Sequence, residues 1–345
     1  MAVRTHVWGM PLTGLASRCG AGADVPMLVA GVGYPSTFAQ LTSWFPDDEA
    51  CAAYLARLRW PEGFRCPRCE CREAWQTSTG LSLCQSCRRK TSVTAGTIFH
   101  RSRLPLTDWF AAVWFVTSQK NGVSALGLQR VLGMGSYRTA WTWMHKLRRA
   151  MVRPDRERLE GVVEVDETSV GGRERGMGTA GRGTTNKAVV AIAVELLEPK
   201  GFGRVRLAHL REVNSATLCG FVGSVVTAGA TVRTDGWNVY APLAETFGHQ
   251  SVAISRTGQP AHVALPGVHR IASLLKRWLT GTLHYGYSID QLDYYLDEFT
   301  FRFNRRTARS RGLLFYRLIQ QAVATDPHPY RELTTAVSVD HYLWP

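Results

Sequence analysis

Four cysteines in two matched pairs constrain this chain more than any other feature. They form Cys66-x-x-Cys69 and, after fourteen intervening residues, Cys84-x-x-Cys87. A Cys-x-x-Cys turn directs two thiolates to one point, and two such turns on facing hairpins complete a closed tetrahedral zinc site. The pattern therefore predicts a zinc ribbon in which these four cysteines hold a structural Zn²⁺. The alternative is a set of buried or redox-active cysteines.

The chain is strongly positive. Its 345 residues include 41 lysines and arginines against 27 acidic residues, a formal net charge of +14. Such a surface favours a polyanionic partner, and we predict double-stranded DNA. The longest apolar stretch, LTDWFAAVWFVTSQ, is too short to cross a bilayer and is interrupted by Asp108, so no membrane association is expected. The amino terminus lacks the pattern of a secretory signal, which predicts a cytoplasmic protein.

Changes of pattern along the chain predict five segments. The first is rich in Gly and Ala and is expected to be a disordered extension, or sequence upstream of the true start. The others are a helix with the zinc ribbon, a helical region, a strand-rich domain and a carboxy-terminal tail. Their predicted boundaries are 1–33, 34–100, 101–155, 156–325 and 326–345.

The helical region contains a candidate helix-turn-helix. The segments SALGLQRVLG and SYRTAWTWMHKLRRAM are joined by a short turn, and helical periodicity assigns two faces to the second segment. The face expected in the core carries Tyr137, Trp141, Met144 and Met151. The face expected to contact DNA carries Arg138, Thr142, His145 and Arg149. The alternative is a solvated basic face on a small helical bundle.

The strand-rich domain carries two aspartates at or beyond the ends of strands that we expect to be neighbours. Asp166 lies in LEGVVEVDETSVGG and Asp235 in ATVRTDGWNVYAPL. Phosphodiester chemistry at neutral pH needs hard divalent cations, and carboxylates are the ligands that such cations prefer. The pair predicts a site for Mg²⁺ or Mn²⁺, although either residue alone is better explained as a turn cap. The Gly-rich basic loop at 171–187 is expected to touch a nucleic-acid backbone or to be disordered.

Taken together, several stretches resemble the bacterial insertion-sequence transposases of the ISXO-like group. The resemblance runs from about Tyr34 to about Gln320 and rests on YLARLRWPEGFRCPRC, EVDET, RTDG, SLLKRWLTGT and YLDEFTFRFNRR. It implies an α/β protein with an RNase H-like catalytic core, a mixed sheet flanked by helices. A zinc ribbon and a small helix-turn-helix-like domain would precede this core.

The resemblance also assigns a third catalytic position, which in that family is often Glu. It precedes SLLKR by four residues and is His269 here, with Lys276 seven residues later. Seven residues are close to two helical turns, so both side chains are expected on one face. His269 would join Asp166 and Asp235 in binding Mg²⁺ or Mn²⁺, and imidazole suits Mn²⁺ better. Lys276 would contact a phosphate or the terminal nucleotide. The alternative for His269 is a surface histidine on a basic helix.

A later helix, LDYYLDEFTFRFNRR, carries a second candidate for the third ligand. Glu298 lies at the edge of its apolar stripe, four residues before Arg302, so an ion pair is the simpler explanation. The resemblance assigns this helix to packing against the catalytic sheet and places Arg305 and Arg306 where they would meet DNA.

The expected function is that of a transposase. It would bind the ends of an insertion sequence and catalyse cleavage and strand transfer by two-metal-ion phosphoryl transfer, as at least a dimer on DNA. Two alternatives remain open. One is a zinc-ribbon DNA-binding protein whose catalytic site has decayed, and the other is an RNase H-like nuclease that cuts without joining.

Overall fold

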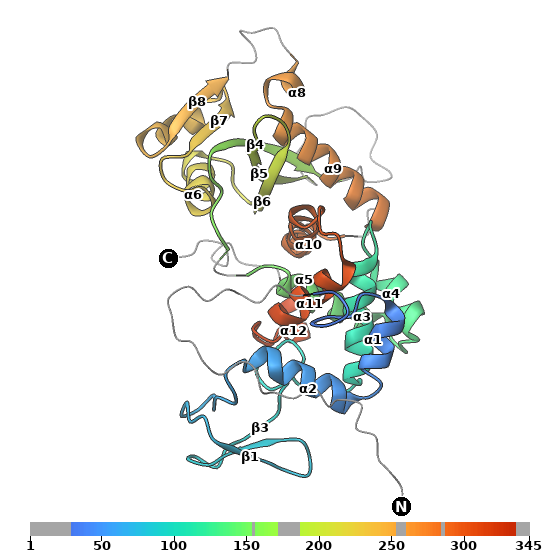
Figure 1. Ribbon diagram of the computed structural model, residues 1–345. Coiled ribbons are helices and arrows are strands. Elements are labelled where there is room, and N and C mark those ends of the chain that lie inside the picture. The colour runs from blue at the N-terminus through green and yellow to red at the C-terminus, as the bar shows by residue number, and fades with distance from the viewer. Residues whose placement is uncertain (1–28, 154–155, 172–186, 253–259, 284–286, 336–345) are drawn as a thin grey trace, which may run out of the picture.

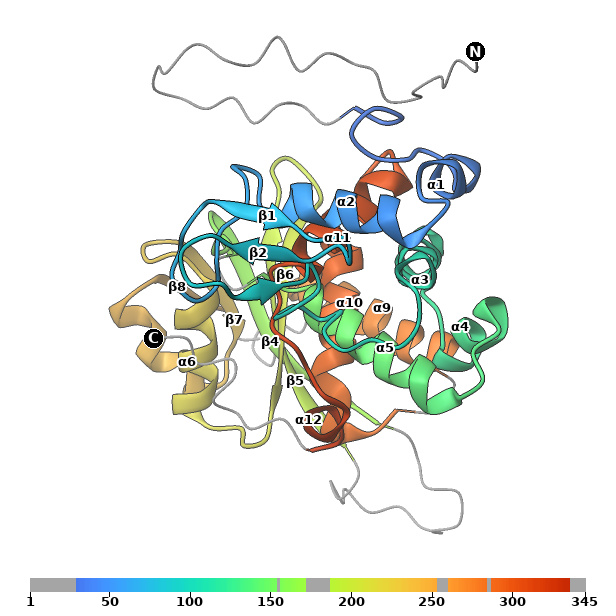
Figure 2. The ribbon, with the colours of Figure 1, turned by 90° about the horizontal axis from the view of Figure 1, so that it is seen from below.

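The computed structural model describes residues 29–153, 156–171, 187–252, 260–283 and 287–335 (Figure 1). Most of the predicted amino-terminal extension and of the Gly-rich basic loop lies outside these residues. The chain folds into a small zinc ribbon at one end, a helical bundle in the middle and a five-stranded sheet with its own helices at the other end. Figure 2 shows the same arrangement from the ribbon end.

The ribbon is a three-stranded antiparallel sheet preceded by two helices. Its strands, in the order β1-β2-β3, are Ala74–Gln76, Ser82–Cys84 and Lys90–Thr91. The helices are α1, Phe38–Trp44, and α2, Asp48–Arg59. Helix α2 begins directly after Asp47, whose carboxylate accepts a hydrogen bond from the Ala50 N–H and caps the helix.

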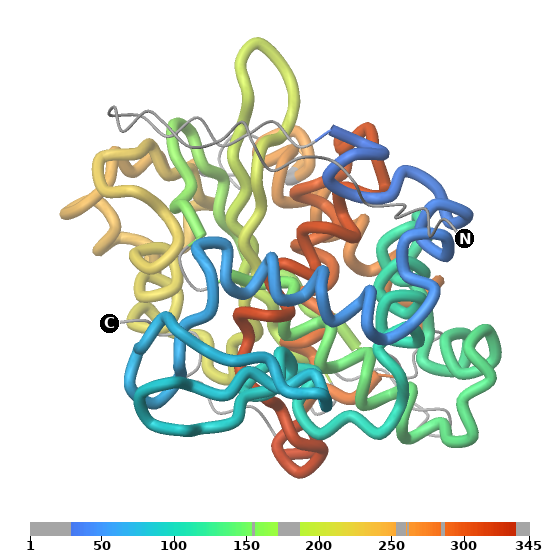
Figure 3. Tube along the Cα trace, turned by 60° about the horizontal axis from the view of Figure 1, so that its bottom comes forward, coloured from blue at the N-terminus to red at the C-terminus, as the bar shows by residue number. Residues whose placement is uncertain are grey.

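The helical bundle takes elements from both ends of the chain. Helices α3 (Leu106–Ser118), α4 (Ala125–Leu132) and α5 (Tyr137–Ala150) share one apolar core with α2 and with α11 (Arg311–Ala322). Trp109 of α3 stacks on Trp143 of α5 with ring centroids 3.7 Å apart. Figure 3 shows the carboxy-terminal segment lying beside the amino-terminal helices, where α11 contacts α2, α3 and α5. Residues 101–155 therefore do not form a core on their own.

The large sheet is mixed. Strands β4 (Val162–Val170), β5 (Ala188–Leu196) and β6 (Phe202–Leu210) form an antiparallel meander, and β7 (Thr231–Asp235) and β8 (Gly248–Val252) add to β4 in parallel. The resulting order is β6-β5-β4-β7-β8. Strand β8 was not predicted, because its residues are mostly exposed and GHQSV lacks apolar alternation.

Helices cover both faces of this sheet, as predicted. Helix α6 (Ser215–Val225) packs on one face, whereas α9 (Pro266–Leu283) and α10 (Leu292–Asn304) pack on the other. The shorter elements are the 3-10 helices η1 and η2 and the helices α8 and α12, at Asn238–Glu245, Ile289–Gln291, Ala261–Ala264 and Tyr330–Thr334. The predicted fold class, a mixed sheet flanked by helices behind a zinc ribbon, is confirmed.

A buried ion-pair cluster joins the bundle to the sheet domain. Glu298 of α10 is fully buried and accepts hydrogen bonds from Arg148 of α5 at 2.8 Å and from Arg302 at 2.7 Å. Burial opposes its ionisation, but Arg302 and Arg148 lower its pKa, so Glu298 is a carboxylate. Arg302 also donates to the Val116 and Gln119 carbonyls at the end of α3. Glu298 is thus an ion-pair partner, as its spacing from Arg302 predicts, and both carboxylate oxygens are engaged.

The two faces predicted for α5 need correction at two positions. His145, expected to contact DNA, is fully buried against Trp141, Tyr294 and Tyr295, with ring centroids 4.0, 4.9 and 5.5 Å away. Helix α10 covers that side of α5, so the groove-facing assignment of His145 was wrong. Tyr137, expected in the core, is 52% exposed because it is the first residue of α5.

Replacement of Glu298 with alanine should lower the free energy of unfolding by about 3–5 kcal/mol, because it leaves Arg148 buried without its carboxylate. Urea denaturation measures the effect. Glu332→Ala removes an acid that is 61% exposed and should change stability by less than about 0.5 kcal/mol. A loss below about 1 kcal/mol for Glu298→Ala would mean that the cluster does not hold the two parts together.

Acid should destabilise the protein through His145. Burial, and then Arg148, hold its pKa well below the ordinary value, so the unfolded chain binds more protons at this residue than the folded chain. Stability is therefore complete above the unfolded pKa of about 6.5 and falls as the pH drops below it, by at most about 2 kcal/mol at pH 5. His145→Phe should remove this increment, so the difference in unfolding free energy between variant and parent should move in favour of the variant from pH 7 to pH 5. An unchanged difference would contradict the assignment.

Candidate active site and zinc centre

The four predicted zinc ligands converge. Their Sγ atoms all lie within 4.8 Å of one another, with 3.5 Å between Cys66 and Cys87 and 3.6 Å between Cys69 and Cys84. A tetrahedral site with Zn–S bonds of about 2.3 Å requires sulfur atoms about 3.8 Å apart, so the residues present fit Zn²⁺. Cys71 lies outside the cluster, with its thiol directed at the Glu73 carbonyl.

The two cysteine knuckles share one backbone geometry. In each, the residue after the second cysteine, Glu70 or Arg88, adopts a positive φ of about 60° or 58°. Its N–H then donates to the carbonyl of the first cysteine, at 2.9 Å to Cys66 and 3.1 Å to Cys84. Left-handed backbone is uncommon for residues other than glycine. Its repetition shows that both turns are shaped to direct two thiols at one point.

The candidate catalytic aspartates lie on neighbouring parallel strands. The pairing of β4 with β7 runs from Val162 and Thr231 to Glu164 and Arg233. Continuing this register by two residues places Asp166 beside Asp235. Because side chains alternate along a strand, both carboxylates share the sheet face of Glu164, the face that α9 covers. Asp166 is the fifth residue of the nine-residue β4, however, so it lies in the middle of that strand and not at its end.

His269 completes this group from α9. Its Nε2 atom lies 4.0 Å from Oδ2 of Asp166, is buried, and has no hydrogen-bond partner. Burial, His262 and Lys276 lower the pKa of His269, which favours the neutral imidazole that metal binding requires. A buried ring nitrogen without a partner beside a carboxylate is a suitable donor for a divalent cation. Lys276, two turns further along α9, is exposed.

Negative charge is concentrated around Asp166. Burial, together with Glu167, Asp235 and Glu164, raises the pKa of Asp166 to about 7. One oxygen of Asp166 accepts from the Glu167 N–H at 2.8 Å, and one of Asp235 accepts from the Trp237 N–H at 3.0 Å. Asp235 therefore also caps the turn that follows β7, whereas Asp166 bonds only to the next residue of its own strand. A divalent cation would offset the crowding of acidic groups and suits this set of oxygen and nitrogen donors.

The three candidate ligands do not converge as the cysteines do. In the described part of the chain, the cysteines are the one group with three or more ligand atoms within 4.8 Å of each other. Asp166, Asp235 and His269 are neighbours whose side chains would have to turn toward a shared cation.

Glu164 sets the position of α9 and was not among the predicted site residues. Its buried carboxylate accepts from the Gly267 N–H at 2.6 Å and from the Val268 N–H at 3.2 Å, in the first turn of α9. A Cβ at Gly267 would lie 2.7 Å from that carboxylate, so glycine allows the close approach. The sequence signal was the acid two residues before Asp166 on the same strand face. Through this contact β4 fixes where His269 stands.

The residues predicted to contact DNA lie in different environments within the protein. Arg138 stacks over Tyr330 at 3.8 Å and, with Thr142, lines a cavity of about 460 Å³ that Arg101, Arg103 and Lys146 also line. Arg149 lies 3.9 Å from Asp297 with 18% of its side chain exposed. Arg305 stacks on Phe301 at 4.1 Å, and Arg306 donates to carbonyls of Phe202, Gly203 and Phe303.

A carboxylate pair on the central strands of such a sheet, with a zinc ribbon ahead of it, defines a class of nucleic-acid-processing proteins with an RNase H-like domain. Residues 158–304 match the ISXO2-like transposase domain, and residues 46–90 match the transposase zinc-ribbon domain. A protein described as an uncharacterized protein in transposable element ISH50 of Halobacterium salinarum is 30% identical over 279 residues, covering 75% of this chain and 91% of that protein. The chain belongs to the ISXO2-like transposase family.

Among the described residues, no helix is both long enough and apolar enough to cross a bilayer.

The purified protein should contain one Zn²⁺ per chain that depends on the clustered cysteines. Cys66→Ser and Cys84→Ser should each abolish stoichiometric zinc, measured by mass spectrometry of the metal, and should lower the thermal midpoint. Cys71→Ser is the matched control and should keep both. Equal zinc loss in all three variants would contradict the proposed ligand set.

Proposed function

We propose that this protein is an active transposase that binds the ends of an insertion sequence and catalyses DNA cleavage and strand transfer. The observation that carries the proposal is the placement of Asp166 and Asp235 each two residues beyond the paired Glu164 and Arg233, with the unpartnered Nε2 of His269 4.0 Å from Asp166. The family supports transposition in general, and this geometry supports a working site in this chain.

Asp166, Asp235 and His269 would hold Mg²⁺ or Mn²⁺. When bound, such cations activate the attacking oxygen and stabilise the leaving oxygen of a phosphodiester. The chain's own residues orient the reaction: Glu164 fixes α9, Asp166 and Asp235 present carboxylates on one sheet face, and the exposed Lys276 on α9 would contact a phosphate of the DNA end.

End recognition would fall to the ribbon and the helix-turn-helix region, in the segments 34–100 and 101–155 that precede the catalytic domain at 156–325. Arg138 and Thr142 line a cavity with three further basic residues, which suits a DNA backbone. Arg149, Arg305 and Arg306 are proposed as supporting contacts, in spite of their partners within the protein. Joining two ends requires two catalytic sites, so we propose at least a dimer on DNA in the cytoplasm.

Assays of DNA binding, cleavage and joining also distinguish two other functions. A DNA-binding protein with a decayed site is favoured by His269 in the position where the family often has Glu. It predicts DNA binding without cleavage. An RNase H-like nuclease predicts cleavage without joined products, and the ribbon and helix-turn-helix ahead of the core argue against it.

Asp166→Asn should reduce cleavage and strand transfer by more than about 100-fold, because loss of a residue that only supports a metal ligand already costs about 10- to 100-fold. The substrate is DNA carrying the sequences that flank the gene, with Mg²⁺ and Mn²⁺ in separate reactions. Gel analysis resolves cleaved and joined products, and gel shift measures DNA binding, which should be unchanged. Asp290→Asn, at an exposed acid of η2, is the matched control. Cleavage by Asp166→Asn at the parental rate would sink the assignment.

His269 is tested by two substitutions in the same assay. His269→Ala should remove activity with both metals, whereas His269→Glu should keep it and improve the use of Mg²⁺ relative to Mn²⁺, since carboxylate is the harder ligand. An inactive parent that His269→Glu restores would establish the decayed site instead. Full activity of His269→Ala would show that the histidine is no ligand.

A further inference from the structure

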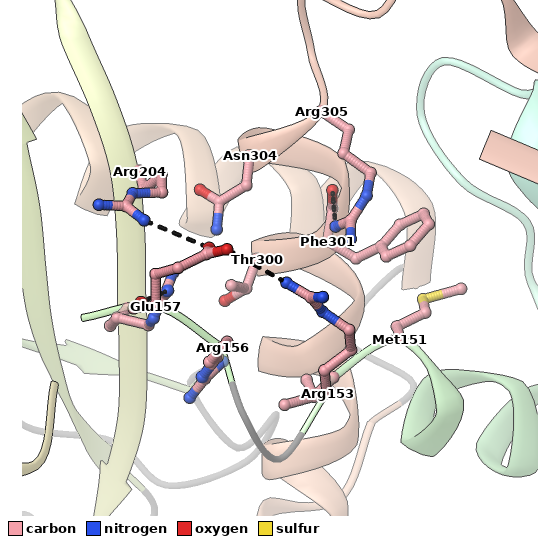
Figure 4. A pocket seen from close by; sticks show the side chains of 11 residues that line it. Met151, Arg153, Arg156, Glu157, Arg204, Thr300, Phe301, Asn304 and Arg305 are labelled. Carbon is pink, nitrogen blue, oxygen red and sulfur yellow. Dashed lines mark hydrogen bonds and ion pairs between the residues drawn. The ribbon is translucent and has the colours of Figure 1, made fainter. Parts of the chain in front are cut away.

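A second charged site lies away from the carboxylates. A cavity of about 260 Å³ opens where the end of α5, the segment leading into β4, strand β6 and helix α10 meet (Figure 4). Five arginines and one glutamate line it, from three separate parts of the chain. They are Arg153, Arg156, Glu157, Arg204, Arg206 and Arg305.

Two of these arginines, Arg206 and Arg305, are largely buried beside other guanidinium groups. Arg206 is 3% exposed, and its guanidinium donates to the Val205 and Glu157 carbonyls. Burial, and then Arg156 and Arg204, lower its pKa to about 9. Burial and the cations Arg153 and Arg317 likewise lower the pKa of Arg305 to about 10. These guanidinium groups repel one another, so an anion between them would be stabilised.

A carboxylate of the protein already stands among them. Figure 4 shows the Glu157 carboxylate between Arg153 and Arg204, and the ion-pair distances are 3.7 Å and 3.4 Å. The Glu157 side chain is 69% exposed, so a change of rotamer can move the carboxylate from the arginines into solvent. Arg204 is also held by Glu195 at 2.7 Å, which fixes its guanidinium without Glu157.

The walls of the cavity are preorganised. The Asn304 amide of α10 accepts from the Val205 N–H at 2.8 Å and donates to the Val205 carbonyl at 3.1 Å. This double contact seals the exposed edge of β6 at that residue and fixes α10 against it. Arg206 pairs across the sheet with Ala193, which pairs with Val165. The backbone of Arg206 thus lies two strand spacings, about 10 Å, from Val165, the residue that precedes Asp166 on β4.

We propose that this cavity binds a backbone phosphate of DNA, which displaces the Glu157 carboxylate from between Arg153 and Arg204. Guanidinium groups match phosphate oxygens in charge and in forked geometry. The volume equals that of several waters at about 30 Å³ each, enough for one phosphate group. The inference rests on the proposed function only in naming DNA as the source of the phosphate. A free phosphate anion would use the same chemistry, and the test separates the two.

The test uses the full chain without divalent metal, so that no catalysis enters. Titration calorimetry measures the affinity of the protein for inorganic phosphate. Fluorescence anisotropy measures its affinity for a DNA duplex at several salt concentrations. The double variant Arg153→Gln/Arg156→Gln should weaken the affinities for phosphate and for the duplex about tenfold or more. It should also reduce the salt dependence of duplex binding. Glu157→Gln should tighten both several-fold, because it removes the competing carboxylate. Arg309→Gln, an exposed arginine that does not line the cavity, should change neither.

The two variants are predicted to change affinity in opposite directions. Unfolding could explain a loss of affinity, but it could not explain the gain predicted for Glu157→Gln. The single change Arg153→Gln, at an exposed residue, is the milder variant if the double one does not fold. Phosphate and duplex affinities equal to the parent in every variant would overturn the proposal. Weakened phosphate binding with unchanged duplex binding would overturn DNA as the source. Because no cleavage is measured, these outcomes stand apart from failure of the proposed catalytic site.

Discussion

The structure depends on one buried carboxylate. Glu298 neutralises Arg148 from the helical bundle and Arg302 from its own helix, and Arg302 also satisfies carbonyls at the end of α3. A buried charge is stable only with its partners in place, so the cluster disfavours arrangements that separate the bundle from α10. Trp278 of α9 adds a hydrogen bond to the Asn121 carbonyl, in the loop after α3. The bundle, and any DNA-binding surface on it, is therefore held in a defined position relative to the sheet that carries Asp166 and Asp235.

A second buried carboxylate, Glu164, positions the helix that carries His269. Glu164 accepts two N–H groups in the first turn of α9, where the helix dipole favours a negative charge, and Gly267 lets the backbone approach. Asp166 follows two residues later on the same face of β4, so one strand supplies both a candidate ligand and the support for another. The two acids of this strand thus differ in role: Glu164 holds α9 in place, and an oxygen of Asp166 lies 4.0 Å from His269.

Local patterns predicted what depends on neighbours in the sequence, and failed where distant segments decide. Cys-x-x-Cys spacing and the strand expected around Asp166 are local features, and the cysteine cluster and β4 follow from them. His145 could not be placed from periodicity, because α10, about 150 residues later, buries the face that was expected to meet DNA. The arginine cavity was equally invisible, since its lining comes from three segments that only the fold brings together.

The imidazole in the third position makes electrostatic sense in this chain. Asp166 already lies near Asp235, Glu167 and Glu164, whose charges raise its pKa to about 7 along with burial. A glutamate at position 269 would add another negative charge to that group, whereas a neutral histidine supplies a donor without one. The histidine therefore lowers the repulsion within the site before a cation binds, and it also lowers the attraction for the cation. The weaker attraction would affect Mg²⁺ and Mn²⁺ alike, because both carry the same charge, whereas the softer nitrogen donor would shift the balance from Mg²⁺ toward Mn²⁺.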